Sequence, residues 1–161
     1  MTEDSNKRSN PYVYAGIALV LILVVYFLFF SSPVPKQPIH WHPYLKIIIN
    51  GNEIEIPANI GVTIGNVIDT DIGMEYQMSP THTHSNDGKI HMENNAPWKK
   101  PETLTLGYFF KVWGNTFNST CIFEYCNGPN GTITMTVNGQ PNKEFDKYPM
   151  KDGDQIVIEY S

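Results

Sequence analysis

An unbroken run of uncharged residues, Pro11–Phe30, constrains this chain more than any other feature of its sequence. As a helix, the run matches the ~30 Å hydrocarbon core of a bilayer, and Tyr12, Tyr14 and Tyr26 near its ends suit the aromatic belts of a membrane. A cleaved signal peptide is the alternative. Its apolar core is ~7–15 residues long and ends at a small-residue cleavage site, for which Ser31-Ser32-Pro33 is a weak substitute. The run therefore predicts an uncleaved transmembrane helix over 11–30.

Basic residues on either side of this run predict the orientation of the chain. Lys7 and Arg8 precede the run, whereas Lys36 is the nearest basic residue after it. Because cytoplasmic flanks are richer in Lys and Arg, we expect a single-pass protein of the cell membrane with its N-terminus in the cytoplasm. Three prolines follow the run within eight residues and indicate an extended spacer. The expected organisation is a cytoplasmic tail over 1–10, the transmembrane helix over 11–30, a proline-rich spacer over 31–39 and an extracytoplasmic metal-binding domain over 40–161.

Composition narrows the class of protein further. The net charge of −5 belongs to the segment after the apolar run, because Lys7 and Arg8 offset Glu3 and Asp4. That segment has no cluster of Lys or Arg, and contacts to phosphates need basic side chains, so nucleic acid is excluded as a partner. Aromatic residues at 12% and hydrophobic residues at 41% exclude a disordered chain.

Alternating apolar residues predict the strands of the domain. Leu45, Ile47 and Ile49 alternate up to Asn50-Gly51, and Ile54 and Ile56 alternate after it, which is typical of a hairpin with a tight Asn-Gly turn. Two further alternating runs close the chain, Ile133 to Val137 before Asn138-Gly139 and Ile156 to Tyr160 after Asp152-Gly153. Residues 59–80 carry no pattern that assigns them to a helix or a strand.

One short helix is expected over Thr105–Trp113. Four apolar residues fall there at i, i+3, i+4 and i+7, and Gly114 follows as a C-terminal cap. The fold class predicted for the whole chain is α+β and mostly β, with the N-terminal transmembrane helix followed by a small β-rich domain. We expect a β-grasp-like mixed sheet with one short helix, and a small antiparallel barrel is the alternative.

All five histidines, with one glutamate, occur in pairs separated by a single residue. The pairs are His40 with His42, His82 with His84, and His91 with Glu93. Side chains of a strand alternate between its two faces, so each pair points both members to one face. A single surface histidine is usually just a solvated side chain, but this repeated spacing favours a metal site.

The register of a hairpin brings two of these pairs together. Asp87-Gly88 lies between the second and third pairs and predicts a two-residue turn. A turn centred there places His84 opposite His91 and His82 opposite Glu93, with Cβ atoms ~4.5–5.5 Å apart. These four residues are the predicted metal ligands, on the sheet face opposite to Ile90 and Met92. His40 and His42 follow the spacer and either join this site, serve a second ion or contact a partner.

The ligand types indicate one transition-metal ion, copper or zinc, as the cofactor. Imidazole nitrogens with a carboxylate suit zinc, copper, iron or nickel, whereas calcium and magnesium prefer oxygen ligands. Copper(II) binds such sites more tightly than zinc, and thiols compete less outside the cytoplasm, so copper is favoured over zinc. Met74 and Met78 are candidate soft ligands for copper(I), although filling gaps in a core is the usual role of Met.

The only two cysteines, Cys121 and Cys126, lie close enough in sequence for a small disulfide loop. Disulfides are favoured in oxidising compartments, and the disulfide is favoured here over a second metal-binding pair. Asn118-Ser119-Thr120 and Asn130-Gly131-Thr132 are glycosylation sequons, which fit the same extracytoplasmic location.

Three motifs resemble those of an uncharacterised group of membrane-anchored extracytoplasmic proteins from archaea and bacteria. They are H-x-H at His40 to His42, H-T-H-x-x-x-G-x-I-H-x-E at His82 to Glu93, and T-L-G-x-F-F-x-x-W-G at Thr105 to Gly114. The resemblance extends from His40 to Tyr160 and implies metal binding, without an activity. The sequence has Ser85 where the group has Asp after H-T-H.

These residues are consistent with three functions. The first is a metal-binding protein that handles copper or serves as an accessory subunit of a membrane metalloenzyme complex, with the membrane and an integral membrane protein or enzyme complex as partners. The alternatives are a small His-ligated metalloenzyme and an interaction module with a structural metal. Catalysis is disfavoured, because it needs an acid or base beyond the ligands, and the turn already explains Asp87.

Overall fold

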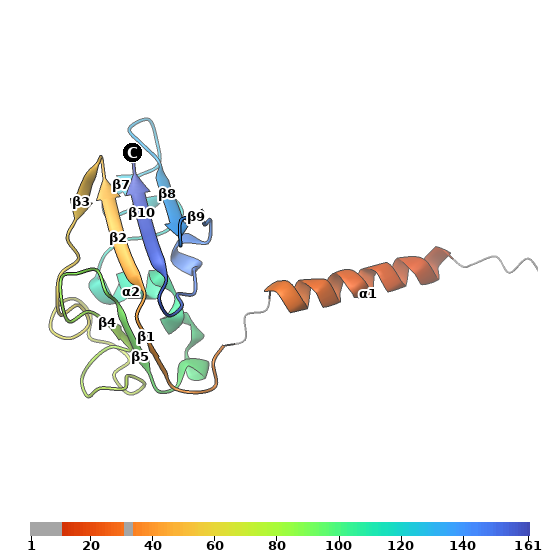
Figure 1. Ribbon diagram of the computed structural model, residues 1–161, viewed down its shortest axis with the longest axis horizontal. Helices are drawn as coiled ribbons and strands as arrows, with labels where there is room; N and C mark the ends of the chain where they lie inside the picture. The colour runs from red at the N-terminus through yellow and green to blue at the C-terminus, as the bar shows by residue number, and fades with distance from the viewer. Residues whose placement is uncertain (1–10, 31–33) are drawn as a thin grey trace, which may run out of the picture. The chain divides into compact units, whose positions relative to one another are not determined.

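The computed structural model describes residues 11–30 and 34–161, apart from the side chains of 11 and 25–30. The chain divides into two compact units, Met1–Pro33 and Val34–Ser161. The first unit contains helix α1, Pro11–Phe30, and the second contains all the described strands (Figure 1). The tail predicted over 1–10 and the first part of the predicted spacer, 31–33, lie outside the described residues.

Helix α1 covers the uncharged run, but the predictions of membrane insertion that depended on this run are wrong. In the described part of the chain, no helix combines the length and the apolar character that crossing a membrane requires. The same finding overturns the predicted single-pass location, with its cytoplasmic N-terminus and extracytoplasmic domain.

The largest sheet of the second unit is mixed and has five strands. Its strand order is β3-β2-β10-β8-β9. The central strands β2 and β10 are parallel, and the other neighbours are antiparallel, so the sheet is not the alternative antiparallel barrel. The strands are β2 Tyr44–Ile49, β3 Asn52–Ile54, β8 Ile133–Val137, β9 Gln140–Pro141 and β10 Gln155–Tyr160.

Alternation of apolar residues explains why these segments form strands. Leu45, Ile47 and Ile49 of β2 are buried, and the residues between them are exposed or half-buried. The Asn50-Gly51 turn has positive φ at both positions, 50° and 79°, as a tight hairpin turn requires. The predicted hairpin is therefore confirmed, and β8 and β10 confirm the two alternating runs at the end of the chain.

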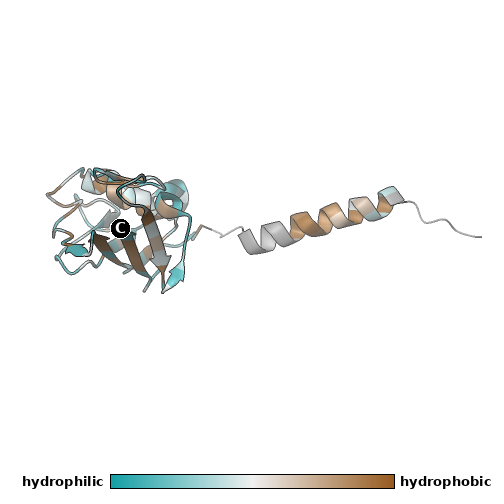
Figure 2. Cartoon of the chain, turned by 90° about the horizontal axis from the view of Figure 1, so that it is seen from above, coloured by the Kyte–Doolittle hydropathy of each residue, from teal (hydrophilic) through white to brown (hydrophobic). Residues whose placement is uncertain are grey.

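Helix α2, Leu106–Trp113, confirms the predicted helix, although it begins one residue after the predicted start. Thr105 is its N-cap and accepts a hydrogen bond from the Tyr108 backbone N–H, while Gly114 adopts the left-handed conformation at its C-terminus. α2 packs with the sheet in one hydrophobic core, and some strands of this unit are strongly hydrophobic whereas others are hydrophilic (Figure 2). Three short 3₁₀ helices complete the helical elements of the described residues: η1 Pro97–Lys99, η2 Pro101–Leu104 and η3 Phe145–Lys147.

The segment 59–80, which has no sequence pattern, consists of turns held by polar contacts. Asp69 accepts hydrogen bonds from the Lys100 ammonium and the Tyr108 hydroxyl. Gly61 packs so tightly against Val112 of α2 that an added Cβ would lie 2.7 Å from the valine side chain. The segment is therefore fixed to α2 and to the chain that precedes α2.

A second, smaller sheet carries the histidines. It has the order β1-β5-β4 and is antiparallel throughout. Its strands are β1 Ile39–Trp41, β4 Thr81–His82 and β5 His91–Asn94. A separate hairpin of β6, Cys121–Ile122, and β7, Tyr125–Cys126, is closed by a disulfide between its two cysteines.

Candidate metal centre

The middle strand of the small sheet brings all the candidate ligands together. β5 carries His91 and Glu93 and pairs with β1 on one side and β4 on the other. The pairing places His40 opposite Glu93 and His82 opposite His91. His42 follows β1 and His84 follows β4, so both end beside β5. The five histidines and the glutamate form two groups that share His91 and Glu93.

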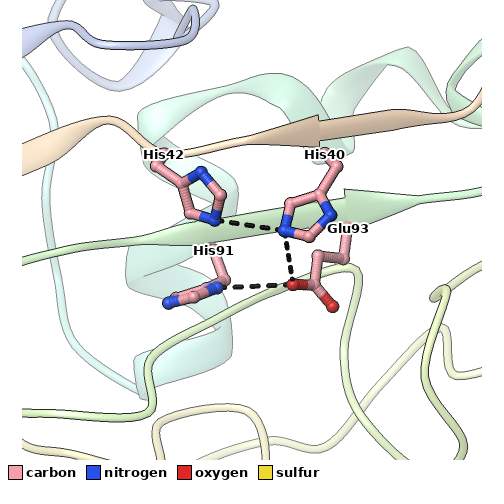
Figure 3. Close-up of side chains that lie close together, drawn as sticks. All are labelled: His40, His42, His91 and Glu93. Atoms are coloured by element: carbon pink, nitrogen blue, oxygen red, sulfur yellow. Dashed lines mark hydrogen bonds and ion pairs between the residues drawn. The ribbon is translucent and has the colours of Figure 1, made fainter.

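The first group contains His40, His42, His91 and Glu93 (Figure 3). One ligand atom from each residue lies within 4.8 Å of the others. The His40 Nε2 atom lies 3.1 Å from both His42 Nε2 and Glu93 Oε1. The His91 Nδ1 atom lies 3.3 Å from the same carboxylate oxygen. The His40 side chain is 55% exposed, so this group opens to solvent.

The second group contains His82, His84, His91 and Glu93. The His82 Nε2 atom lies 3.1 Å from His84 Nε2 and 3.9 Å from Glu93 Oε2. The ring centroid of His91 lies 4.6 Å from that of His84. The His82 side chain is buried and His84 is exposed, so this group extends from the interior to the surface.

These distances match the spacing of ligands around one transition-metal ion. Bonds of ~2.0–2.1 Å at angles of ~90–110° place two ligand atoms ~2.8–3.4 Å apart. The pairs His40–His42 and His82–His84, each with 3.1 Å between their Nε2 atoms, fall within that range. Each group could therefore hold a metal ion.

A hydrogen bond fixes the protonation of the buried histidine. The Nδ1 atom of His82 lies 2.9 Å from the Ser79 carbonyl oxygen. Because a carbonyl oxygen only accepts, His82 must donate through Nδ1–H. Burial lowers the pKa of His82 to about 4, so the ring is neutral at pH 7. Its Nε2 atom then carries a lone pair directed into the cluster, the state that a metal ligand requires.

The shared carboxylate is buried and lies beside three imidazoles. The Glu93 side chain is 6% exposed, and in the described part of the chain its ion pairs are with three histidines, His40, His82 and His91. Buried charges in proteins are paired or coordinate a metal. Because His82 is held neutral, a bound cation would compensate the Glu93 carboxylate better than these imidazoles do.

The predicted hairpin register is wrong, although the predicted face is right. His91 lies opposite His82, not opposite His84, and the register is therefore displaced by two residues. Gly88 has positive φ but Asp87 does not, so the two do not form the expected two-residue turn. A displacement of two residues leaves every side chain on its original face. Ile90 and Met92 are fully buried, as the sequence predicts.

Contacts with distant segments explain this displacement. The Leu45 backbone N–H donates to the Gly88 carbonyl, and the Ile90 N–H donates to the Pro43 carbonyl. The Thr83 N–H donates to the Ile60 carbonyl. Residues 83–90 therefore pair with the start of β2 and with 57–60, and the chain cannot close directly into a tight hairpin.

Three residues that support the site are not recognisable from the sequence. The Ser79 carbonyl orients His82, and the Asp152 carboxylate accepts a hydrogen bond from the His42 backbone N–H at 2.8 Å. The buried Thr83 hydroxyl donates to the Pro57 carbonyl and accepts from the Ile60 N–H, which fixes the segment between His82 and His84. The only sequence signal for Asp152 is its Asp-Gly turn, which carries no indication of a contact with His42.

The remaining candidates lie at the edge of the site or outside it. Met74 is exposed, and its backbone N–H donates to the Glu93 carbonyl at 2.9 Å. Met78 is half-buried. Cys121 and Cys126 form a disulfide and so are not a second metal-binding pair.

Comparison of the chain with known protein families, curated proteins and solved structures gives no match. The resemblance of its motifs to a group of archaeal and bacterial proteins therefore stays a prediction. The geometry of the site alone carries the functional argument.

Proposed function

We propose that this chain is a metal-binding protein whose His/Glu cluster takes up a transition-metal ion for metal handling or for a partner metalloenzyme complex. The observation that carries the proposal is the shared pair His91 and Glu93, with which each H-x-H pair forms a group whose ligand atoms all lie within 4.8 Å of one another. Copper is the favoured ion. All the ligands in the two groups are nitrogen or oxygen donors, and copper(II) exceeds zinc in affinity for such sites.

A role in handling the metal, rather than a purely structural role, is supported by exposure. His40 and His84, one from each pair, are exposed, so an ion can enter and leave without unfolding the domain. The hydrophobic core forms around α2 and the five-stranded sheet and needs no ion to fill it. An ion that only stabilised the fold would be expected in a closed site with four protein ligands.

Metal analysis of the full-length chain after dialysis tests this proposal. The chain is expected to retain at least one equivalent of copper in the presence of equal zinc. The double variant His91→Ala/Glu93→Gln removes the residues common to both groups and should retain none. Glu124→Gln, an exposed carboxylate outside both groups, is the matched control and should behave like the parent chain. A double variant that keeps all its copper would refute the proposed site.

A further inference from the structure

We infer that the cluster binds two metal ions, with the Glu93 carboxylate bridging them. This inference rests on the proposed function and adds a second ion to it. One ion is assigned to His40, His42 and Glu93, and the other to His82, His84 and Glu93. His91 lies between the two pairs and supplies a further ligand.

The two oxygens of the carboxylate face different histidine pairs. Glu93 Oε1 lies 3.1 Å from His40 Nε2, whereas Glu93 Oε2 is the oxygen nearer to His82 Nε2, at 3.9 Å. A carboxylate that gives one oxygen to each of two ions holds them close together, at ~3.5–4 Å in known two-metal sites. Glu93 is held for this role by β5, whose neighbours on both sides carry the histidines.

The six candidate ligands also exceed what one four-coordinate ion can use. A four-coordinate ion bound by the second group would leave His40 and His42 out of its coordination, with their Nε2 atoms 3.1 Å apart and hydrogen-bonded to each other. The same holds for His82 and His84 if the ion is bound by the first group. Each pair is thus already arranged as two ligands of an ion of its own.

The position of His91 supports a shared centre. Its ring centroid lies 4.7 Å from that of His42 and 4.6 Å from that of His84, so it is equally close to both pairs. Each ion has three ligands, namely two histidines and Glu93. His91 can complete the coordination of only one of them, so the other ion keeps an open coordination position. Open positions are the feature that lets a metal site exchange ligands or bind a small molecule.

The two histidine pairs differ in how firmly their ligand atoms are already oriented. This difference predicts which pair binds the first metal ion. His82 is buried and oriented by the Ser79 carbonyl, so its lone pair is already directed at the site. His40 is exposed, and its ring contacts are with His42 and Glu93. We expect the first equivalent at His82 and His84 and the second at His40 and His42.

Copper titration of the metal-free, full-length chain tests the inference, with bound copper counted after gel filtration. Two equivalents are expected for the parent chain and for Glu124→Gln, and one for His40→Ala/His42→Ala, whose replaced side chains lie outside the hydrophobic core. One equivalent in the parent chain, unchanged in that double variant, would overturn the two-ion inference and leave the proposed function intact. No bound copper at all would overturn both.

Electron paramagnetic resonance of the fully loaded chain tests the bridge. Two copper(II) ions joined by one carboxylate are expected to give less signal than two isolated ions. Glu93→Gln removes the anionic bridge while keeping nearly the same shape, so it should lose one equivalent or restore the signal of isolated ions. If Glu93→Gln retains two equivalents with the parent's weakened signal, Glu93 is not the bridge.

Discussion

Replacing His84 by Ala separates the metal-dependent stability of the protein from its intrinsic stability. His84 is exposed, and its ring contacts are with His82 and His91. Substitutions at exposed positions usually change the free energy of unfolding by less than ~0.5 kcal/mol. The metal-free variant should therefore unfold almost like the metal-free parent chain.

The metal-loaded proteins should differ much more. An ion present at 1,000 times its dissociation constant stabilises the native state by ~4.1 kcal/mol. Losing a residue that only supports a ligand weakens metal binding by up to ~100-fold. Losing a ligand itself should therefore weaken binding by at least that factor. At the same free copper, the variant would then keep ~1.4 kcal/mol, a loss of ~2.7 kcal/mol. For a domain of this size that loss lowers the Tm by roughly 10 °C.

Urea and thermal unfolding, each with and without copper, measure this difference. Asn86→Ala is the matched control, because Asn86 is exposed in the same loop and belongs to neither ligand group. It should keep the full copper-induced increase in Tm. The reasoning is refuted if His84→Ala shows the parent's copper-induced increase, or if it destabilises the metal-free protein by the same amount as the loaded one.

Three further predictions concern residues around the site and the fold. Gly88→Ala should destabilise the domain by ~1–3 kcal/mol in urea unfolding, because φ is +77° and the new Cβ would lie 2.5 Å from a backbone oxygen; Gly51→Ala, at φ +79° with no atom within 4 Å, should cost less. The pKa of Asp69 is lowered, since burial raises it but hydrogen bonds from an ammonium and a phenol outweigh that effect. Its charged form therefore stabilises the fold above pH ~4, and this contribution is lost as the pH falls through the lowered pKa. Asp69→Asn lacks this contribution, so its stability should fall less steeply between pH 5 and 3 when unfolding is followed by circular dichroism. Replacing Cys121 and Cys126 by Ser opens a loop closed at a sequence separation of 5, which should cost ~2 kcal/mol in urea unfolding and leave the copper content unchanged.

Elements defined by local contacts could be predicted from the sequence. The hairpin turn at Asn50-Gly51 depends on two residues that tolerate positive φ, and α2 depends on its own periodicity, the Thr105 cap and Gly114. The pairing of cysteines five residues apart is equally local. In each of these cases the interaction that determines the structure lies within one short segment.

The register at the metal site could not be predicted, because it depends on distant partners. Residues 83–90 are paired with Pro43, Leu45 and Ile60, and no local pattern indicates these contacts. The candidate ligands still lie together because the displacement is an even number of residues, which conserves the face of a strand. The proximity of His40 and Glu93 likewise arises from the pairing of β1 with β5 across a long stretch of chain.

The N-terminal predictions failed for a different reason. They were drawn from the uncharged run over 11–30 and its flanking residues, and no helix in the described part of the chain has the length and apolar character to cross a membrane. The location and orientation that followed from that helix fail with it. The assignment of the metal cluster is unaffected, because it depends only on residues of the unit Val34–Ser161.

X-ray absorption spectroscopy of the copper-loaded, full-length chain tests the central claim most directly, because it reports the atoms bound to the metal. The His/Glu cluster predicts a first shell of nitrogen and oxygen with the multiple-scattering signature of imidazole, and no sulfur. That signature should weaken in His82→Ala/His84→Ala and stay unchanged in Glu124→Gln. A first shell that contains sulfur, or one without imidazole, would contradict the assignment of the site.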